Sequence, residues 1–231
     1  MKLSVVIPVF NEAKTIGQVI RRVLAEKTPK EIIVVDDGST DKTLKIIQDY
    51  SSKLIILKNK KNLGKGAAVR KGIKNATGDI LVIQDADLEY HPKYYRKLLA
   101  PIRAGKTKAV YGSRLKTMKF RLWGKDKTPL PTHYLANFFL SRLTNLLYRS
   151  HLTDMETGYK AMTREVYRSL ELQSSGFEIE PEITAKILKK GYQIIEVPIK
   201  TKPRGYQEGK KIKAKDAFRA AGTLFKYFLK D

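Results

Sequence analysis

Short apolar runs alternate with helix-like segments along the first half of the chain, and this alternation most constrains the fold. We expect strands at residues 3–9, 31–35, 54–58 and 79–84, with helices at 13–26, 41–51 and 66–76. The strand segments are continuously apolar instead of alternating between apolar and polar, which is typical of strands covered on both faces. The pattern therefore predicts an α/β fold, in which a mostly parallel central sheet carries helices on both faces.

The second half is less regular. We expect further helices at 91–103, 135–148, 164–170, 183–190 and 215–230, with strands at 109–112 and 193–199. A basic, polar loop fills residues 116–132. Because no repeat or low-complexity linker interrupts the sequence, we predict a single domain over residues 1–231.

The charge balance points to an anionic partner. The chain has 46 Lys and Arg against 23 Asp and Glu, a net charge of +23. Nucleic acid, a membrane surface or a phosphorylated substrate would suit this charge. The alternative is a lysine-rich solvated surface like that of thermophile proteins. The absence of cysteine excludes disulfides and thiolate metal sites. No signal peptide and no apolar run of transmembrane length is present, so we expect a cytoplasmic location.

Carboxylates follow the fourth expected strand. Asp85-Ala86-Asp87 comes directly after it, and Glu89 follows two residues later. Carboxylates at this spacing can converge on one small volume, and their oxygens suit Mg²⁺ or Mn²⁺, which in turn suit phosphate oxygens. The alternative is that these acids cap a helix or a turn. The motif therefore suggests a metal and diphosphate site.

Other polar residues follow the neighbouring strands. Asn11 and Glu12 come after the first strand, and Asp36 and Asp37 after the second. Because ligands of such sheets bind beyond the carboxyl ends of the strands, we expect these side chains at a shared crevice. One of the two aspartates is expected to accept a hydrogen bond from a base or a ribose there. A glycine-containing turn at 62–66 precedes a helix, whose N–H groups and Lys65 would favour an anion, although loops of this composition are common.

Three features of the second half allow two interpretations each. Arg114 follows a short strand and could pair with phosphates, or form a surface ion pair. His133 could act in the site or serve a structural role. The acids Glu178, Glu180 and Glu182 precede an expected helix, where acids also favour the helix dipole.

Taken together and in order, these segments resemble the family 2 glycosyltransferases of the GT-A fold, a Rossmann-like fold. Residues 4–12, 35–41, 62–66 and 85–87 resemble the opening strand and turn, the nucleotide signature, the third loop and the metal motif of that family. Residues 111–114, 154–160, 177–182, 196–199 and 204–212 resemble the polyprenyl-phosphate branch, whose type is dolichol-phosphate mannose synthase.

The resemblance implies a role for each candidate residue. It assigns nucleotide-sugar binding to Pro8, Val9, Asn11, Glu12, Asp36, Asp37, Lys65, Asp85 and Ala86, and the metal, Mg²⁺ or Mn²⁺, to Asp85, Asp87 and Glu89. Acceptor-phosphate binding falls to Arg114, Arg204, Lys210 and Lys211, and catalytic roles to Asp87, Arg114, His133, Glu180, Glu182 and Arg204. Residues 1–115 would form the nucleotide-sugar half and 116–231 the acceptor half.

The resemblance implies a metal-dependent, inverting transfer of a hexose, mannose or glucose. The donor would be a nucleoside-diphosphate sugar of the GDP-mannose or UDP-glucose type, and the acceptor polyprenyl or dolichyl phosphate. The alternatives are a soluble saccharide or protein acceptor and, more remotely, a nucleic-acid-binding module. Unlike in the larger synthases of this branch, we expect no C-terminal transmembrane domain. The amphipathic segments 135–148 and 215–230 lead us to expect peripheral contact with an anionic membrane at its cytoplasmic face, or else ordinary packing on the domain.

Overall fold

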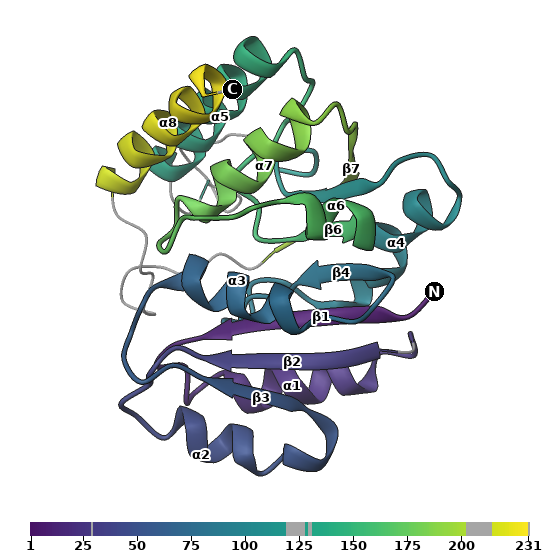
Figure 1. Cartoon of the computed structure of the whole chain (residues 1–231), viewed down its shortest axis with the longest axis vertical. Helices are drawn as coiled ribbons and strands as arrows, with labels where there is room; N and C mark the ends of the chain where they lie inside the picture. Colours follow the sequence, from purple (N-terminus) through teal and green to yellow (C-terminus); the bar gives the residue numbers. More distant parts are fainter. Residues whose placement is uncertain (29, 119–127, 129–130, 202–213, 231) are drawn as a thin grey trace.

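A seven-stranded sheet runs through the computed structural model, which describes residues 1–28, 30–118, 128, 131–201 and 214–230 (Figure 1). The strand order is β3-β2-β1-β4-β6-β5-β7. The strands are β1 (Leu3–Val9), β2 (Lys30–Asp36), β3 (Ile55–Lys58), β4 (Ile80–Ile83), β5 (Ala109–Ser113), β6 (Lys160–Thr163) and β7 (Ile194–Pro198).

The sheet is mostly parallel, as predicted. β1 pairs in parallel with β2 and β4, β2 with β3, and β5 with β7. The exception is β6, which is antiparallel to both of its neighbours, β4 and β5. The sequence pattern did not predict β6, which comes from the second half of the chain and lies between two strands of the first half. That residues 1–231 form one domain, divided near residue 115, stays a prediction.

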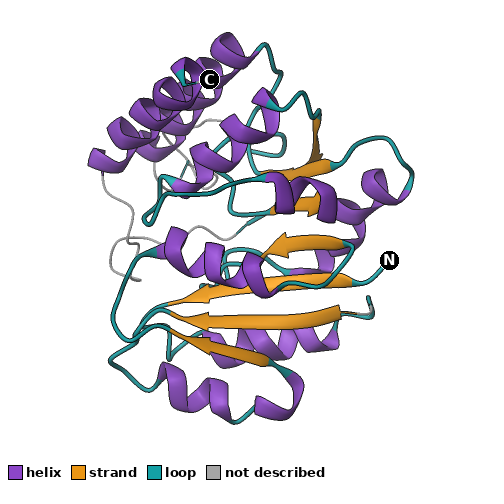
Figure 2. Cartoon of the chain, in the orientation of Figure 1, coloured by secondary structure: helices purple, strands orange, loops and turns teal. Residues whose placement is uncertain are grey.

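Helices cover both faces of the sheet, which confirms the predicted α/β class (Figure 2). On one face, α1 (Ile16–Ala25), α2 (Thr43–Gln48) and α4 (Tyr95–Arg103) share a core cluster with Val5 and Ile7 of β1. On the other face, α3 (Lys65–Asn75), α6 (Arg164–Ser169) and α7 (Ile179–Lys189) share a second cluster with Val6. Alternate side chains of β1 thus feed the two cores, because successive side chains of a strand point to opposite faces. Two short 3₁₀ helices complete these layers, η1 (Ser51–Lys53) and η2 (Pro92–Tyr94).

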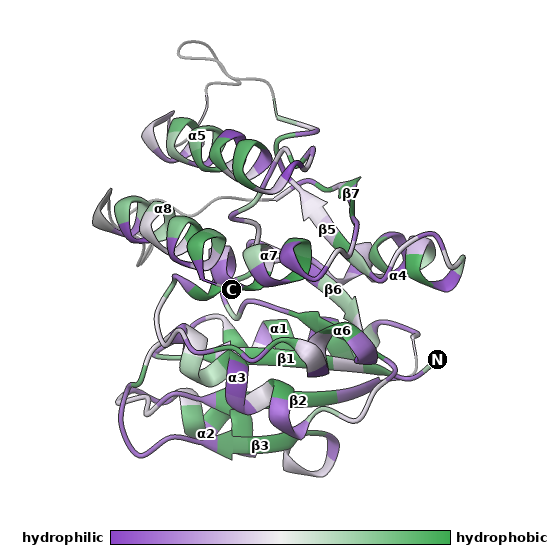
Figure 3. Cartoon of the chain, turned by 45° about the horizontal axis from the view of Figure 1, so that its top comes forward, coloured by the Kyte–Doolittle hydropathy of each residue, from purple (hydrophilic) through white to green (hydrophobic). Residues whose placement is uncertain are grey.

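Two longer helices, α5 (Pro131–Tyr148) and α8 (Ala214–Leu229), pack together against α7 (Figure 1). Leu140 of α5, Ala185 of α7 and Leu224 of α8 meet in a third core cluster. Figure 3 shows further hydrophobic residues along α5 and α8. The apolar face expected on the first of these helices is divided: Leu143 and Leu147 pack against the cluster, whereas Leu146 is 78% exposed. Among the described residues, no helix combines the length and the apolarity needed to cross a bilayer.

Candidate active site

A pocket of about 330 Å³ lies where β1, β2 and β4 end. Its lining includes ten of the residues singled out from the sequence: Pro8, Val9, Glu12, Asp37, Lys65, Asp85, Ala86, Asp87, Glu89 and Arg114. Six other residues complete the lining. Phe10, Asn62, Gly64 and Phe177 lie in segments named from the sequence without a role of their own, and Ala68 and Tyr90 were not considered for the site. Segments that are far apart in the sequence thus meet at the carboxyl ends of the parallel strands, where ligands of such sheets bind.

Asn11 and Glu12 shape the first loop of this pocket. Asn11 adopts a φ of 50°, and its side-chain Oδ1 accepts a hydrogen bond from the Thr40 backbone N at 2.8 Å. Glu12 is buried, and its Oε2 accepts a hydrogen bond from Thr15 Oγ1 at 2.8 Å. Glu12 lines the pocket, while Asn11 joins the loop after β1 to the loop after β2.

The adjacent acids at the end of β2 have different surroundings. The Asp37 carboxylate accepts hydrogen bonds from Asn59 Nδ2 at 2.7 Å and from the Gly64 backbone N at 2.7 Å, and it lines the pocket. Asp36 is fully buried and does not belong to the pocket lining. Within the described part of the chain its Oδ2 has no hydrogen-bond partner. Asp37 therefore both faces the pocket and organises the loop that precedes α3.

The N-terminus of α3 is used within the protein, which corrects its expected role in anion binding. The Gly66 backbone N donates to Gly176 O, and the Ala67 backbone N donates to Ser175 O, each at 3.1 Å. A Cβ at Gly66 would clash with the Ser174 carbonyl oxygen. The segment 174–176 therefore takes the place that an anion would need, and the Lys65 side chain is what this helix end presents to the pocket.

Lys65 begins a chain of four buried or nearly buried charges. Its Nζ lies 2.7 Å from Asp85 Oδ1 and 2.9 Å from Glu180 Oε1. Glu180 in turn pairs with Lys160, whose side chain is fully buried in β6. Burial alone would raise the pKa of the Glu180 carboxyl, but the ammonium groups of Lys160 and Lys65 outweigh it and hold that pKa below its usual value. Burial would lower the pKa of Lys65, yet Asp85 and Glu180 raise it well above the usual value. Glu180 and Lys65 therefore both stay ionised at neutral pH.

The acidic motif after β4 is held by its neighbours. Asp87 Oδ1 accepts a hydrogen bond from the Glu89 backbone N at 3.1 Å, across Leu88, whose φ is 66°. A Cβ at Gly158 would clash with Asp85 Oδ2, so only glycine fits beside that carboxylate. Asp85, Asp87 and Glu89 all line the pocket, but nowhere in the described ranges do three acidic or imidazole side chains converge on a metal position.

Arg114 is held by a buried carboxylate. Its Nε and Nη2 each donate to an oxygen of Asp154 at 2.8 Å, and its backbone N donates to the same carboxylate at 2.7 Å. Burial would raise the pKa of Asp154, but Arg114 outweighs it and lowers that pKa. Asn137 of α5 adds a further hydrogen bond to Asp154 at 2.7 Å. Arg114 therefore forms a bidentate pair with a buried carboxylate in the pocket lining, and not the surface ion pair considered from the sequence.

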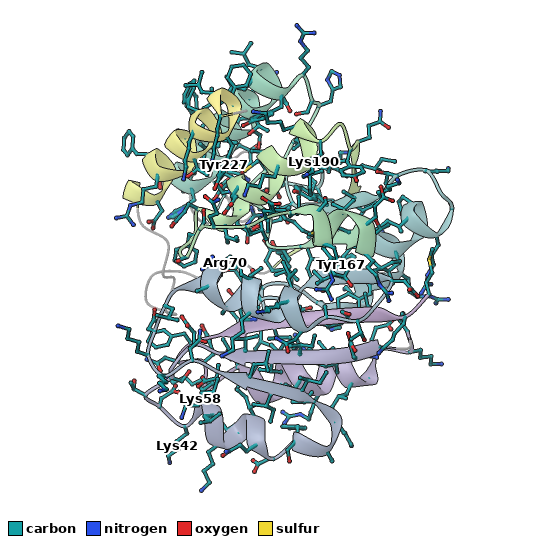
Figure 4. All side chains as sticks on the ribbon, viewed as in Figure 1. Lys42, Lys58, Arg70, Tyr167, Lys190 and Tyr227 are labelled. Atoms are coloured by element: carbon teal, nitrogen blue, oxygen red, sulfur yellow. The ribbon has the colours of Figure 1, made fainter. Side chains whose placement is uncertain are left out.

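The remaining sequence candidates lie elsewhere. Glu182 accepts hydrogen bonds from the backbone N of Gln173 and Ser174 and from Tyr227 Oη of α8, which Figure 4 labels. These contacts join three segments and lie outside the pocket lining. His133 is half-buried in the first turn of α5 and is likewise absent from that lining. Arg204, Lys210 and Lys211 fall outside the described residues.

Several residues that build the site were missed in the sequence. Tyr90 lines the pocket, its ring lies 6.0 Å from the Arg114 guanidinium, and its hydroxyl accepts a hydrogen bond from the Gly158 backbone N. Lys160 was missed because its strand was missed. The segment 154–160, which the resemblance names, contains Lys160 and the Gly158 that contacts Tyr90, but no role in the site was assigned to either residue.

Comparison with known proteins agrees with this geometry. The sequence model of the family described as "Glycosyl transferase family 2" matches residues 4–170, more than half of the chain. The chain belongs to the family 2 glycosyltransferases. The predicted family is thereby confirmed, and so is the prediction that the chain is an enzyme.

Relatives of this glycosyltransferase include enzymes of the predicted branch. A dolichol-phosphate mannosyltransferase from Pyrococcus furiosus is 32% identical over 232 residues, which cover 98% of this chain but only 63% of that relative. A UDP-N-acetylglucosamine–dolichyl-phosphate N-acetylglucosaminyltransferase from Methanococcus voltae is 32% identical over 219 residues, covering 86% of this chain and 85% of the relative. These matches confirm the similarity to the polyprenyl-phosphate branch.

Solved structures confirm the GT-A fold of this glycosyltransferase. Glucosyl-3-phosphoglycerate synthase from Mycobacterium tuberculosis, in complex with uridine diphosphate, superposes with a TM-score of 0.74 at 22% identity, covering 98% of this chain and 80% of that one. Mannosyl-3-phosphoglycerate synthase from Rubrobacter xylanophilus gives a TM-score of 0.72 at 21% identity, covering 98% and 72%. At this level of identity, the likeness concerns the fold alone.

Proposed function

We propose that this glycosyltransferase transfers a hexose, mannose or glucose, from a nucleoside-diphosphate sugar to a polyprenyl phosphate with inversion at the anomeric carbon. The observation that carries the proposal is that one pocket joins the carboxylates after β1, β2 and β4 to a fixed arginine, Arg114. The carboxylates suit a donor bound through a divalent ion, and the arginine suits a phosphate. The two dolichyl-phosphate relatives support the choice of acceptor.

The donor would lie across the ends of β1 and β2. Pro8, Val9, Glu12 and Asp37 line that side of the pocket and would contact the nucleoside. Asn11 and Asp36 would act indirectly, because Asn11 joins the two loops and Asp36 is buried behind them. We propose a donor of the GDP-mannose or UDP-glucose type for this position.

The donor set of the pocket fits Mg²⁺ or Mn²⁺. Asp85, Asp87 and Glu89 supply hard carboxylate oxygens, and Gly158 leaves room for Asp85 to stay in place. Because no three such side chains converge on one position among the described residues, oxygens of the diphosphate would supply further ligands. When bound, the ion would neutralise charge on the leaving diphosphate. The solved complexes of the glucosyl-3-phosphoglycerate synthase with Mn²⁺ or Mg²⁺ and UDP support this proposal.

The acceptor would meet Arg114. Its guanidinium is preorganised by Asp154, so it can align an acceptor phosphate without reorganising. A phosphate is already anionic near neutral pH, and it therefore needs no general base, only alignment and removal of water. Further cations for the acceptor phosphate are proposed to come from Arg204, Lys210 and Lys211. We propose that His133 approaches the acceptor from α5 and that Glu180 acts through Lys65. Glu182, given its contacts, would act by holding the segment 173–176.

A membrane surface is the proposed source of the acceptor. The large apolar side chains exposed on α5 and α8 are Leu135, Phe138, Phe139, Leu146, Phe218, Phe225, Phe228 and Leu229. Arg142 lies beside them, with its guanidinium 5.1 Å from the Phe138 ring centroid. Apolar side chains next to cations are typical of helices that lie in the interface of an anionic membrane. We propose peripheral attachment at the cytoplasmic face through these two helices.

The test is a transfer assay with Mg²⁺, labelled GDP-mannose or UDP-glucose, and a short polyprenyl phosphate. We expect label in the organic phase with one of the two donors. The Asp87→Ala variant should lose turnover while its circular dichroism is unchanged. Asp79→Asn is the matched control, because Asp79 is exposed and directly precedes β4, at the end of the strand away from the pocket. Full activity of Asp87→Ala with added Mn²⁺ would contradict the metal assignment, and label that stays on a soluble saccharide or protein would contradict the lipid acceptor.

A further inference from the structure

The position of Lys65 has a consequence for how the metal enters the site; the inference rests on the proposed metal role of Asp85. The Lys65 ammonium lies 2.7 Å from Asp85 Oδ1 and 2.9 Å from Glu180 Oε1, with its side chain 16% exposed. Asp85 is thus already neutralised by a cation of the protein itself. The pocket-lining carboxylate proposed for the metal is engaged before any metal arrives.

A second cation at Asp85 would meet electrostatic repulsion. A divalent ion on this carboxylate would lie close to the ammonium that contacts the same oxygen, and in a partly buried site such repulsion is screened weakly. The four linked groups, Lys65, Asp85, Glu180 and Lys160, carry two positive and two negative charges and balance one another. A metal ion alone adds uncompensated charge to this set, whereas a metal ion with a diphosphate does not.

Lys65 has a fixed partner that would retain it if it left Asp85. Glu180 is buried, and it is held by Lys160, whose Nζ also donates to the carbonyl oxygens of Met155 and Thr157. The backbone of Lys65 is fixed as well, because its neighbours Gly64 and Gly66 pack tightly against residues 174–176. Only the Nζ end of Lys65 therefore needs to move, and Glu180 keeps it beside the pocket.

We propose that Lys65 is an exchangeable counter-ion of Asp85 that makes metal binding conditional on the diphosphate. Without nucleotide, Lys65 neutralises Asp85 and keeps its affinity for a divalent ion low. When a diphosphate enters, its oxygens accept hydrogen bonds from Lys65 Nζ and give the metal its missing ligands. Metal and diphosphate consequently bind cooperatively, and by linkage each raises the affinity for the other by the same factor.

The test measures Mn²⁺ binding without any turnover, by electron paramagnetic resonance of free Mn²⁺. Wild type, Lys65→Gln, Lys65→Arg and Lys74→Gln are titrated with Mn²⁺ alone and with inorganic pyrophosphate, corrected for the Mn²⁺–pyrophosphate complex in solution. Lys65→Arg keeps the charge at the site, and Lys74→Gln removes an exposed charge from the same helix, α3. Unfolding midpoints show that each variant is folded.

We expect Lys65→Gln to bind Mn²⁺ alone about tenfold more tightly than wild type, the scale typical of coupling between sites. The gain from pyrophosphate should shrink by a similar factor, and the part that comes from pyrophosphate oxygens as metal ligands should remain. Lys65→Arg and Lys74→Gln should resemble wild type. In wild type, the factor by which pyrophosphate raises Mn²⁺ affinity should equal the reverse factor. Unchanged Mn²⁺ affinity in folded Lys65→Gln, or no coupling between Mn²⁺ and pyrophosphate in wild type, would overturn the proposed role of Lys65 and leave the metal site standing. Failure of every variant to bind Mn²⁺ under both conditions would overturn the metal site and this inference together.

Discussion

At the scale of single residues, the buried ion pair of Lys160 and Glu180 makes stability sensitive to substitution, because both side chains are removed from water. Lys160 is fully buried, and its loss would leave Glu180 short of one of its two cations. We expect Lys160→Met to lower the free energy of unfolding by about 3–5 kcal/mol, as for other broken buried pairs. Urea unfolding followed by circular dichroism measures this.

The matched control is Lys108→Met, which breaks an exposed pair with Glu165. No measurable change is expected there, because exposed ion pairs contribute little. Equal unfolding midpoints for wild type and Lys160→Met would show that the buried pair is not stabilising.

Glu156 should make the stability depend on pH. Its Oε1 is buried without a hydrogen-bond partner among the described residues, and burial raises the pKa of this carboxyl from 4.5 to about 7. The charges around it are Lys160 and Arg114, which favour ionisation, and Glu180 and Asp154, which oppose it. Because the folded state holds the proton more tightly than the unfolded state, stability is lost as the pH rises from about 4.5 to about 7.

We therefore expect wild type to lose about 1–3 kcal/mol more than Glu156→Gln between pH 5 and pH 8. Chemical unfolding at each pH measures the difference, with the exposed Glu171→Gln as control. Parallel pH profiles of wild type and Glu156→Gln would contradict the raised pKa.

The residues of the pocket divide into those that the sequence predicts and those that it does not. Asp37, Asp85 and Asp87 follow buried strands, and the carboxyl ends of parallel strands meet at one edge of the sheet, so their closeness is predictable. The partner of Arg114 could not be predicted, because Asp154 is 40 residues away and its burial depends on α5. Pairing between distant side chains leaves no periodicity in a sequence.

At the scale of elements, the contact between the segment 174–176 and the start of α3 fixes the third loop of the pocket. A Cβ at Gly66 would clash with the Ser174 carbonyl oxygen, whereas a Cβ at Gly222, inside α8, meets nothing within 4 Å. We expect Gly66→Ala to lower the free energy of unfolding by about 1–3 kcal/mol through overpacking. Gly222→Ala should raise it by about 0.5–1 kcal/mol through helix propensity.

Thermal and urea unfolding of the two alanine variants provide the comparison. Stabilisation by both substitutions would mean that the segment 174–176 moves aside easily, contrary to the close packing described above.

Some helix and strand boundaries do not follow from the periodicity of apolar residues. β6 is only four residues long and contains Lys160, so it has no apolar run that would mark a strand. It is stable in the sheet because Glu180 neutralises that lysine. α7 begins at Ile179, four residues before the expected start, because Pro181 and the acids around it fit the first turn of a helix. α2 begins at Thr43, whose backbone N donates to Asp41 Oδ1 at 2.9 Å.

At the scale of the whole molecule, the exposed apolar side chains gather on α5 and α8. We expect the protein to co-sediment with vesicles that contain anionic lipid, less so at high salt because screening weakens the attraction. Replacing Leu146 and Phe218 by Ser should reduce the bound fraction several-fold, since they are 78% and 81% exposed. Ile55→Ser is the control, because Ile55 is an exposed apolar residue of β3, at the far edge of the sheet. Equal sedimentation with and without vesicles would remove the membrane proposal.

The late position of β6 in the sequence has a consequence for folding during synthesis. A nascent chain that has reached residue 115 can pair β3, β2, β1 and β4, but the free edge of β4 then faces solvent until β6 has emerged, about 50 residues later. Open strand edges invite pairing with other chains. The growing polypeptide thus passes through an interval in which four of the seven strands are paired and one edge is unprotected. Shielding by a chaperone would matter most in that interval.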